Sequence, residues 1–388
     1  MRACVLSDVA ELEVRDVTQP EPGPYDVLVR VSAVGLCGTD FHIFEGHANY
    51  NTDDSGAAIS LSGQPQILGH EIAGVIEEVG KNARDLHIDL RPDLHSGDRV
   101  VLDQGLNCKS AHRETLCEYC ATGDSHQCEH YREHGITGLQ GGLAEYIAVP
   151  AVNAVRIDSD IDLAAAAVTE PLGCILHSSQ MAGSVKSRYS INSMDPGRRT
   201  KSILVFGAGP AGLLFIEYLR NVSGFEGLLI VSEPNAKKRS LASSLGAMCI
   251  DPNSVDIVGA VHDSTHGRGV EYLIEASGSG KAIEIAPRLI RKQATVLLYG
   301  HGHAGVDMSV INRLLFREPV FVAPVGASGG FDDRGRPVTY IRALQLIEQG
   351  RINVGRFITH RYSSLEEVPA AFRSDHHSPD YVKGVVVL

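Results

Sequence analysis

ILVFGAGPAG, residues 203–212, is the stretch that decides the fold. Four apolar residues predict a buried strand, and Gly207, Gly209 and Gly212 follow with the spacing of a dinucleotide-binding turn. The first glycine permits a tight turn, the second lets a pyrophosphate approach the backbone, and the third lets a helix pack on the strand. Pro210 and Ala211 open that helix, whose N-terminus offers unpaired N–H groups to phosphates. The stretch therefore predicts a dinucleotide site.

Glu233 indicates which dinucleotide would bind. It closes the next predicted strand, roughly 20 residues after the last glycine, as this fingerprint requires. A carboxylate there accepts hydrogen bonds from the ribose hydroxyls of NAD but would repel the 2′-phosphate of NADP. Lys237, Lys238 and Arg239 follow closely and keep NADP open, with Lys238 a candidate cofactor contact. We interpret these three cations mainly as the solvated face of a helix, so the pattern favours NAD.

Around this turn, apolar runs of strand length alternate with segments of helical spacing. The predicted strands are residues 203–206, 228–232, 272–275, 295–299 and 320–324, and the clearest helices are 210–221 and 235–245. Strand–helix alternation with fully apolar strands is typical of a doubly wound parallel sheet. We therefore assign residues 166–326 to an α/β, dinucleotide-binding domain.

The flanking sequence has a different pattern. Half-buried strands with a two-residue period, separated by Gly and Pro, are predicted at residues 25–34, 72–79, 99–102 and 144–149. This pattern favours an antiparallel, barrel-like unit. Because 388 residues exceed one hydrophobic core and the α/β pattern stops near Ala327, we expect residues 1–165 and 327–388 to form the other domain. Two polar stretches, 46–65 and 186–201, are expected to be surface loops.

Composition excludes several classes of function. The net charge of −12 argues against a nucleic-acid-binding surface and gives no attraction to anionic membranes. The N-terminus lacks the apolar run of a signal peptide, and no apolar stretch approaches the length of a membrane span. We expect a cytoplasmic protein, in which eight cysteines favour metal binding over disulfides.

Four of those cysteines predict a structural zinc site in a lobe near residues 103–130. Cys108, Cys117, Cys120 and Cys128 have the spacing C-x8-C-x2-C-x7-C. Four thiolates complete the tetrahedral coordination of zinc and leave no open position. The long first gap leaves His112, which lies inside it, as an alternative to Cys108.

A second set of metal-ligand residue types is dispersed along the chain. Cys37, His70 and a carboxylate from Glu71 or Glu170 would give three protein ligands. A fourth position would stay open for water or substrate, as a catalytic zinc requires. Taken singly, each is more often an ordinary buried residue, and spacing alone cannot assemble them.

Together, these features resemble the medium-chain zinc-dependent alcohol dehydrogenase family, in its polyol and sugar branch. The motifs that carry the resemblance are GLCGTDFH (35–42), GHEIAGVIEEVG (69–80), GDRV (97–100), the four-cysteine lobe, GGLAEY (141–146), EPLG (170–173), GAGPAG (207–212) and HRYSSLEEVPAAF (360–372). The resemblance implies a GroES-like β-barrel catalytic domain with a Rossmann domain, one catalytic and one structural zinc, and a homodimer or homotetramer.

The resemblance also implies the metal ligands. Cys37 and His70 correspond to catalytic zinc ligands, and Glu170 stands where polyol, glucose and threonine dehydrogenases have a glutamate ligand. Glu71 resembles a residue that approaches the metal directly or through water. Asp40 would hydrogen-bond a ligand imidazole and fix its tautomer.

A proton relay is implied in the same way. Zinc would bind the substrate hydroxyl as a Lewis acid, and the proton would leave through Thr39, the nicotinamide ribose and His42, which would pass it to solvent. Hydride would then pass from the carbinol carbon to the nicotinamide.

The sequence departs from the family at three places. The stretch 46–65 lies near the substrate mouth in relatives, so substrate size is not carried over. Six extra residues separate Cys108 from Cys117, and Gln293-Ala294 replaces a usual glycine. Polar residues of the first stretch either bond substrate hydroxyls or are merely solvated: Asn49, Tyr50, Asn51, Asp53 and Asp54.

The predicted function is hydride transfer from a secondary hydroxyl of a polyol or sugar-like alcohol to NAD. Threonine and vicinal-diol dehydrogenases share the glutamate at position 170 and stay open as alternatives. A zinc-free quinone or enone reductase would lack Cys37, His70 and the four-cysteine lobe. A non-enzymatic NAD- and zinc-binding protein would be expected to lose Thr39, His42 and Glu170.

Overall fold

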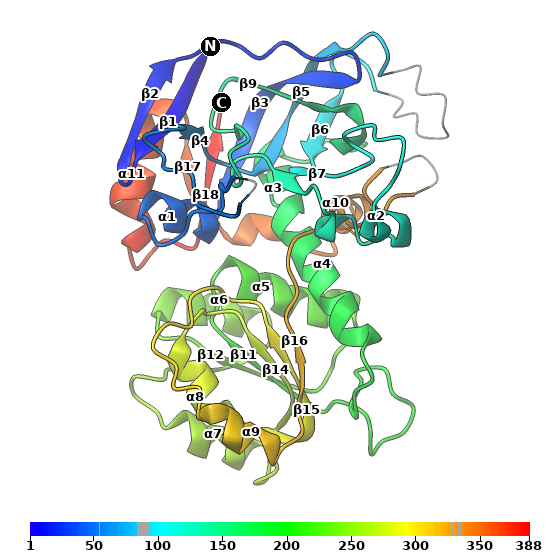
Figure 1. The fold of residues 1–388 in the computed structure, drawn as a ribbon. Coiled ribbons are helices and arrows are strands. Elements are labelled where there is room, and N and C mark those ends of the chain that lie inside the picture. Colours follow the sequence, from blue (N-terminus) through cyan, green and yellow to red (C-terminus); the bar gives the residue numbers. More distant parts are fainter. Residues whose placement is uncertain (54, 84–93, 328, 333–335) are drawn as a thin grey trace. The chain divides into compact units, whose positions relative to one another are not determined.

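The structure, a computed structural model, describes all residues except 54, 84–93, 328 and 333–335, and divides the chain into two compact units (Figure 1). Unit 1 comprises Met1–Cys174, Gly326–Gly350 and Ile358–Leu388, and unit 2 comprises Ile175–Val325 and Arg351–Phe357. The first boundary falls inside helix α4 (Thr169–Ser184), later than residue 165, and a short segment near the C-terminus returns to unit 2.

Unit 2 is built on a six-stranded parallel sheet with the order β13-β12-β11-β14-β15-β16. Its strands are β11 (Ser202–Phe206), β12 (Leu228–Ser232), β13 (Met248–Ile250), β14 (Val270–Glu275), β15 (Ile290–Leu298) and β16 (Val320–Val322). Its helices are α5 (Pro210–Glu217), α6 (Ala236–Ser244), α7 (Ile257–Ser264), α8 (Gly280–Leu289) and α9 (Val310–Leu315). In chain order the strands run 3-2-1-4-5-6, so the predicted doubly wound sheet is confirmed.

Two elements of unit 2 differ from the sequence pattern. The helix after the glycine turn ends as an α-helix at Glu217 and continues as a π-helical turn, Tyr218–Val222. Strand β15 starts before Thr295, and a break in its register against β14 accommodates the extra residues. Gln293 lies in this irregular part with φ +60°, a left-handed conformation that normally favours glycine. The left-handed conformation explains why the family usually has a glycine here. It also means that Gln293 adopts this conformation with backbone strain.

Unit 1 is built on a mainly antiparallel seven-stranded sheet with the order β10-β6-β5-β3-β18-β17, in which β9 also pairs with β3. These strands are β3 (Asp26–Leu36), β5 (Glu71–Val79), β6 (Arg99–Leu102), β9 (Tyr146–Pro150), β10 (Ala154–Arg156), β17 (Ile358–Tyr362) and β18 (Lys383–Val387). The exception to the antiparallel pattern is the pair β17–β18, which is parallel.

Smaller elements complete unit 1. A second sheet joins β1 (Arg2–Asp8), β2 (Glu11–Asp16) and β4 (Gln66–Ile67), and a third joins β7 (Gly105–Leu106) and β8 (Arg132–Glu133). The helices are α1 (Gly38–Phe44), α2 (Glu118–Thr122), α3 (Leu163–Ala167), α10 (Val338–Glu348) and α11 (Val368–Arg373), besides the start of α4. No helix among the described residues is both long and apolar enough to cross a membrane.

Strand β3 organises the core of unit 1. Its two-residue period predicted a half-buried strand, but the structure buries it along most of its length. The reason is its central position, because β3 pairs with β5, β9 and β18 and both of its faces are covered. Val27 and Val29 belong to one hydrophobic cluster, and Ala33 belongs to another. This rigid strand leads directly into the candidate metal site.

Candidate functional site

The dispersed metal-ligand residues meet where β3 runs into α1. Cys37 is the N-cap residue of α1, and Asp40 lies in the first turn of that helix. One oxygen of Asp40 accepts the N–H of Cys37 at 2.9 Å, and the other accepts the N–H of Gly69 at 3.1 Å. The second oxygen also lies 3.4 Å from Nδ1 of His70. One buried carboxylate therefore fixes the two loops that carry Cys37 and His70.

Three donor atoms of zinc type converge at this point. The ligand atoms of Cys37, His70 and Glu71 lie within 4.8 Å of one another. His70 and Glu71 are buried, with 3% and 0% exposure. Burial alone would lower the pKa of His70, but the nearby Asp40 and Cys37 raise it well above its usual value. A thiolate, an imidazole and a carboxylate are ligands that zinc takes in catalytic sites, so the donor set fits this ion.

Glu71 has a partner that the sequence did not reveal. Nζ of Lys383, at the start of β18, donates to Oε1 of Glu71 at 2.5 Å and to the carbonyl of Leu36 at 2.9 Å. Burial would lower the pKa of Lys383, but the charges of Glu71, Cys37 and Asp40 and the hydrogen bond to Glu71 together outweigh it, so the pKa is raised. Oε2 of Glu71 is buried and has no hydrogen-bond partner among the described residues. That oxygen is the one available to a cation.

Glu170, the other candidate carboxylate, lies in the first turn of α4. It is not in the three-atom group among the described residues. Its carboxylate accepts a hydrogen bond from Nε2 of Gln104 at 3.2 Å and one from the thiol of Cys174 at 3.3 Å. Burial raises the pKa of Glu170 to about 7, against the opposing charge of His70. Glu170 is therefore close enough to His70 to be affected by its charge, while one of its oxygens, Oε1, accepts both hydrogen bonds.

A buried polar network supports Glu170, and sequence reasoning missed it. Gln104 accepts a hydrogen bond from the hydroxyl of Tyr340 on α10, and its amide also donates to Glu133 at 3.4 Å. Burial raises the pKa of the Glu133 carboxyl. No motif marks these residues, because they come from separate segments. Only Lys383 could have been noticed in the sequence, because it is a charged residue at the start of an otherwise apolar strand.

The two predicted relay residues lie on α1, one turn apart. Oγ1 of Thr39 is 3.8 Å from the sulfur of Cys37. Nδ1 of His42 is buried and has no hydrogen-bond partner in the described part of the chain. The ring of His42 lies 6.1 Å from that of His47. Thr39 is thus beside a candidate ligand, and His42 is further along the helix.

The four cysteines of the lobe form a second cluster, with all four sulfurs within 4.8 Å of one another. Sγ of Cys128 lies 3.6 Å from that of Cys108 and 3.8 Å from that of Cys117. A tetrahedron with zinc–sulfur bonds of 2.3 Å has edges of about 3.8 Å, so the cluster fits a structural zinc. The alternative ligand His112 is not in the cluster, and its ring lies 4.4 Å from that of Tyr25.

The glycine turn of unit 2 leaves room for a ligand at one position only. Gly207 has φ +89°, as a tight turn requires. A Cβ added to Gly212 would lie 2.1 Å from the carbonyl oxygen of Gly207, so close packing excludes any side chain there. A Cβ on Gly209, the N-cap residue of α5, would meet no atom within 4 Å. Protein packing therefore leaves Gly209 open, as the approach of a phosphate requires.

Glu233 does more than the sequence predicted. It is 6% exposed, and its two oxygens accept the N–H groups of Ala208 at 2.7 Å and of Asn235 at 2.8 Å. It therefore holds the glycine turn against the next helix. A carboxylate has about four acceptor positions, so acceptor capacity for a ribose hydroxyl is left over.

The cations after Glu233 do not all form a solvated helix face. Lys238 is half-buried, and its backbone N–H donates to the side chain of Asn235 at 3.0 Å. Arg239 contradicts the interpretation, because its guanidinium donates to the carbonyls of Glu233 and Pro234 and lies 3.0 Å from Asp251. The sequence pattern was misleading because these acceptors lie in the turn before the helix and at Asp251, which directly follows strand β13.

The polar stretch 46–65 mostly bonds to itself. Asp53 accepts three hydrogen bonds from Ser55 and Ala57, and Nδ2 of Asn49 donates to the carbonyl of Ile59 at 2.8 Å. Asp54 lies outside the described residues. Tyr50 differs, because burial and the charges of Cys37 and Glu133 raise its pKa. The hydroxyl of Tyr50 is therefore within electrostatic range of the candidate metal ligand Cys37.

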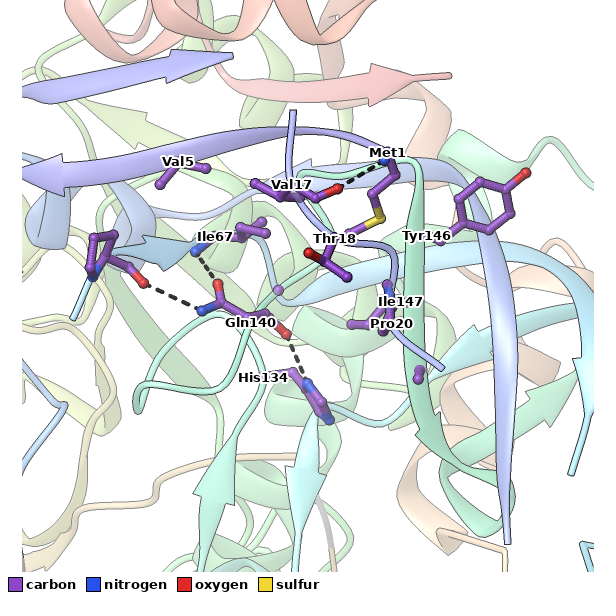
Figure 2. Close-up of a pocket in the computed structure, with 13 residues that line it drawn as sticks. Met1, Val5, Val17, Thr18, Pro20, Ile67, His134, Gln140, Tyr146 and Ile147 are labelled. Carbon is purple, nitrogen blue, oxygen red and sulfur yellow. Dashed lines mark hydrogen bonds between the residues drawn. The ribbon is translucent and has the colours of Figure 1, made fainter. Parts of the chain in front are cut away.

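A cavity of about 470 Å³ lies elsewhere in unit 1 (Figure 2). Gln140 borders it and donates to the carbonyl of Pro65, while its carbonyl accepts from Nδ1 of His134 at 2.8 Å. The lining residues are Met1, Val5, Val17, Thr18, Pro20, Pro65, Ile67, His134, Gln140, Gly141, Tyr146, Ile147 and Ala148. None of them is a predicted site residue, so this hollow is separate from the metal and cofactor sites.

Two family models match the sequence. The alcohol dehydrogenase GroES-like domain matches residues 23–159, and the zinc-binding dehydrogenase domain matches residues 210–347. The first match contains both groups of metal-ligand residues except Glu170, and the second begins at the helix after the glycine turn.

Curated relatives and solved structures match almost the whole chain. L-threonine 3-dehydrogenase of Thermococcus kodakarensis is 32% identical over 361 residues, which cover 93% of this chain and 90% of that protein. L-idonate 5-dehydrogenase of Vitis vinifera is 27% identical and covers 98% and 93%. A structure from Sinorhizobium meliloti 1021, assigned to the zinc-binding dehydrogenases and bound to NADP, has a TM-score of 0.78 at 30% identity and covers 100% and 99%.

Proposed function

The chain belongs to the zinc-dependent medium-chain alcohol dehydrogenase family, and we propose that it oxidises a secondary hydroxyl of a polyol or sugar-like alcohol, with NAD as the hydride acceptor. In this proposal unit 1 is the catalytic domain that holds both zinc ions and binds the alcohol. Unit 2 is the Rossmann domain, which binds the dinucleotide at the Gly207–Gly212 turn through Gly209 and the start of α5.

One observation carries the proposal, namely the convergence of Cys37, His70 and Glu71, in which one oxygen of Glu71 has no hydrogen-bond partner among the described residues. Three protein ligands leave a fourth position for the substrate hydroxyl. Zinc bound there would supply Lewis-acid chemistry that lowers the pKa of a bound hydroxyl. Glu170 is the alternative third ligand, and it would bind zinc as the deprotonated carboxylate.

The protein side chains perform the remaining work. Asp40 orients His70 and holds the Cys37 loop. Thr39 accepts the proton of the substrate hydroxyl at Oγ1, beside the sulfur of Cys37, and His42 delivers it to solvent. Lys383 keeps one oxygen of Glu71 occupied, so that the carboxylate presents the other oxygen to the metal.

Two features support a polar, multiply hydroxylated substrate. The idonate dehydrogenase relative is named for a sugar acid. Tyr50 supplies a hydroxyl that lies near the charges of Cys37 and Glu133. A second candidate is L-threonine, whose side chain is also a secondary alcohol, because a threonine dehydrogenase is 32% identical over nearly the whole chain.

The test is NADH formation by zinc-loaded protein over a panel of polyols, sugars, sugar acids, L-threonine, vicinal diols and simple alcohols. Activity with a polyol, a sugar or a sugar acid, lost in chelator-treated protein and restored by zinc, is the expected result. Activity with threonine alone would keep the mechanism and replace the substrate class. Turnover unaffected by zinc removal would overturn the proposal.

The choice of NAD rests on the carboxylate of Glu233, although one structural relative holds NADP. A matched pair of variants tests the cofactor cradle. Gly209→Ala should unfold like the wild type but bind NADH at least about tenfold more weakly, because only a ligand would meet the new methyl group. Gly212→Ala should also lose stability, since its Cβ meets the Gly207 carbonyl. Binding of NADPH as tight as NADH by the wild type would contradict the NAD assignment.

We also propose that the enzyme is a homodimer or homotetramer. Strand β16 is an edge of the parallel sheet of unit 2. Large apolar side chains are exposed on and beside α9, at Met308 (66%), Leu315 (66%) and Phe316 (83%). Exposed apolar patches and free sheet edges favour association. Analytical ultracentrifugation should give a mass of two or four chains for the wild type, and Phe316→Glu should weaken the assembly.

Finally, we propose that the enzyme works in the cytoplasm. All eight cysteines are free thiols, and four of them form the zinc cluster. Reducing compartments preserve thiols in this state.

A further inference from the structure

A third group of metal-ligand side chains lies at the end of α1 that is remote from Cys37. Glu45 is the C-cap residue of this helix, and His376 and His377 come from the 3-10 helix η6 (Asp375–His377). Oε1 of Glu45 lies 3.1 Å from Nε2 of His376 and 3.6 Å from Nε2 of His377. The three ligand atoms are within 4.8 Å of one another. No sequence motif marks the group, because the fold alone joins its two segments.

His376 is held in the orientation that a metal ligand requires. Its Nδ1 lies 3.0 Å from the carbonyl oxygen of Ala371, and a carbonyl can only accept, so Nδ1 carries the proton. The other ring nitrogen, Nε2, faces Glu45 and donates to it in the metal-free protein, so a bound metal would displace that proton. The ring is stacked on Phe41, with 4.2 Å between centroids and 6° between planes, and the side chain is 9% exposed. Metal-ligating histidines commonly donate their other ring N–H to a backbone carbonyl in this way.

The charge of Glu45 suits a cation. Burial would raise its pKa, but the hydrogen bond with His376 and the neighbouring histidines lower it below its usual value. His47, a further histidine, has Nδ1 3.1 Å from the other oxygen of Glu45. The carboxylate is therefore ionised at neutral pH and is surrounded by imidazoles on both sides.

We propose that Glu45, His376 and His377 bind a divalent transition-metal ion of the zinc class, at a site separate from the two zinc sites described above. Ligand atoms bonded to a tetrahedral zinc at 2.0–2.1 Å lie about 3.3–3.4 Å apart, and the measured 3.1 and 3.6 Å bracket this spacing. Imidazole ligands suit zinc, copper and nickel, whereas calcium and magnesium take oxygen ligands. Three protein ligands leave a position for water.

An ion in this site would fasten the C-terminal segment to α1. Glu45 follows that helix directly and Cys37 precedes it, so the new site and the catalytic ligand are about 12 Å apart along the helix axis. Because only the folded chain brings Glu45 and η6 together, occupancy should stabilise unit 1, and above the dissociation constant this stabilisation should grow with the logarithm of the free metal concentration.

The test counts zinc in protein whose catalytic and structural sites are already filled. Zinc-loaded protein is equilibrated with added zinc ions and passed through a desalting column, and bound zinc is measured by mass spectrometry of the metal. The wild type should retain one more zinc ion per chain than His376→Gln/His377→Gln. Calorimetric titration should show binding weakened by more than about tenfold in this variant. Added zinc should raise the melting temperature of the wild type and not that of the variant.

The control variant is His266→Gln, which removes an exposed histidine of unit 2 and should bind zinc like the wild type. Glu45→Gln removes the central carboxylate while preserving its shape, and it should lose the extra zinc even if the double histidine variant folds poorly. The proposal is overturned if the wild type holds no zinc beyond the two ions of the proposed catalytic and structural sites. It is equally overturned if Glu45→Gln and the folded double variant both keep the extra ion.

Discussion

The two candidate zinc sites of unit 1 are built in opposite ways. The four cysteines of the lobe come from one short stretch, Cys108 to Cys128, and each supplies only its thiol. The group of Cys37, His70 and Glu71 comes from two segments, and its orientation depends on Asp40 and Lys383. The spacing of the cysteines in the sequence therefore predicts the local site. The dispersed site depends on tertiary contacts that sequence spacing cannot predict.

The largest effect is expected for Cys117→Ser in the local site. Structural zinc contributes about 10–16 kcal/mol of apparent binding free energy in small zinc-dependent folds, so losing one of four ligands should release the ion. Residues 103–130 should then become sensitive to limited proteolysis, while the parallel sheet of unit 2 stays protected. Metal analysis should find one zinc ion fewer per chain. An unchanged zinc content would show that the cluster does not hold the ion.

The next effect concerns the dispersed site and is kinetic. Thr39→Val preserves the shape of the side chain and removes the hydroxyl that we assign to proton transfer. Turnover should fall by about 10²- to 10⁴-fold, the usual contribution of a positioned acid–base group. Zinc content and the dissociation constant of NADH should stay at wild-type values. Normal turnover in this variant would rule out the relay.

The same contrast explains how far the sequence could predict the molecule. The parallel sheet was predictable because most of its strands contain apolar runs, although β13 was missed because only one of its three residues, Ile250, is buried. Candidate zinc ligands were predictable as residue types in motifs. Gln104, Tyr340 and Lys383 were not, because their roles arise from partners that are distant in the chain. Arg239 was misinterpreted for a different reason, because its acceptors lie beside the helix, at Glu233, Pro234 and Asp251, and helical spacing does not show them.

A buried ion pair provides the next test of this contrast. Lys383→Met leaves the buried charge of Glu71 without its partner, and breaking such a pair costs about 3–5 kcal/mol. Urea denaturation should show this loss in the free energy of unfolding. Adding Glu71→Gln should recover part of it, because the uncompensated charge is then gone. A loss below about 1 kcal/mol would mean that Lys383 does not support the dispersed site.

The smallest effect is expected at Asp162, which belongs to neither metal site. Burial would raise its pKa, but its bonds to Arg361 and to the N–H of Ala164 lower it below the usual value. A lowered folded-state pKa stabilises the protein above the unfolded-state pKa of about 3.9, and this contribution is lost as pH falls through the folded-state pKa. Asp162→Asn should therefore cost less than about 1 kcal/mol near neutral pH, because the ion pair is exposed.

Melting temperatures measured across this acid range show whether the stabilisation by Asp162 is lost as the pH falls. The difference between the wild type and Asp162→Asn should shrink as pH falls below about 4. The exposed neighbour Asp160 offers a matched control, since Asp160→Asn removes an equal charge outside the helix cap. A difference that grows in acid would contradict the assignment.

The central claim is that the dispersed group is the catalytic zinc site and the cysteine lobe is not. Cys37→Ser tests it most directly, with zinc content and NADH formation measured on the same preparation, using an alcohol that the wild type oxidises. We predict one zinc ion fewer per chain, wild-type binding of NADH, and a loss of turnover of about 1,000-fold or more. Wild-type zinc content together with wild-type turnover would contradict the account.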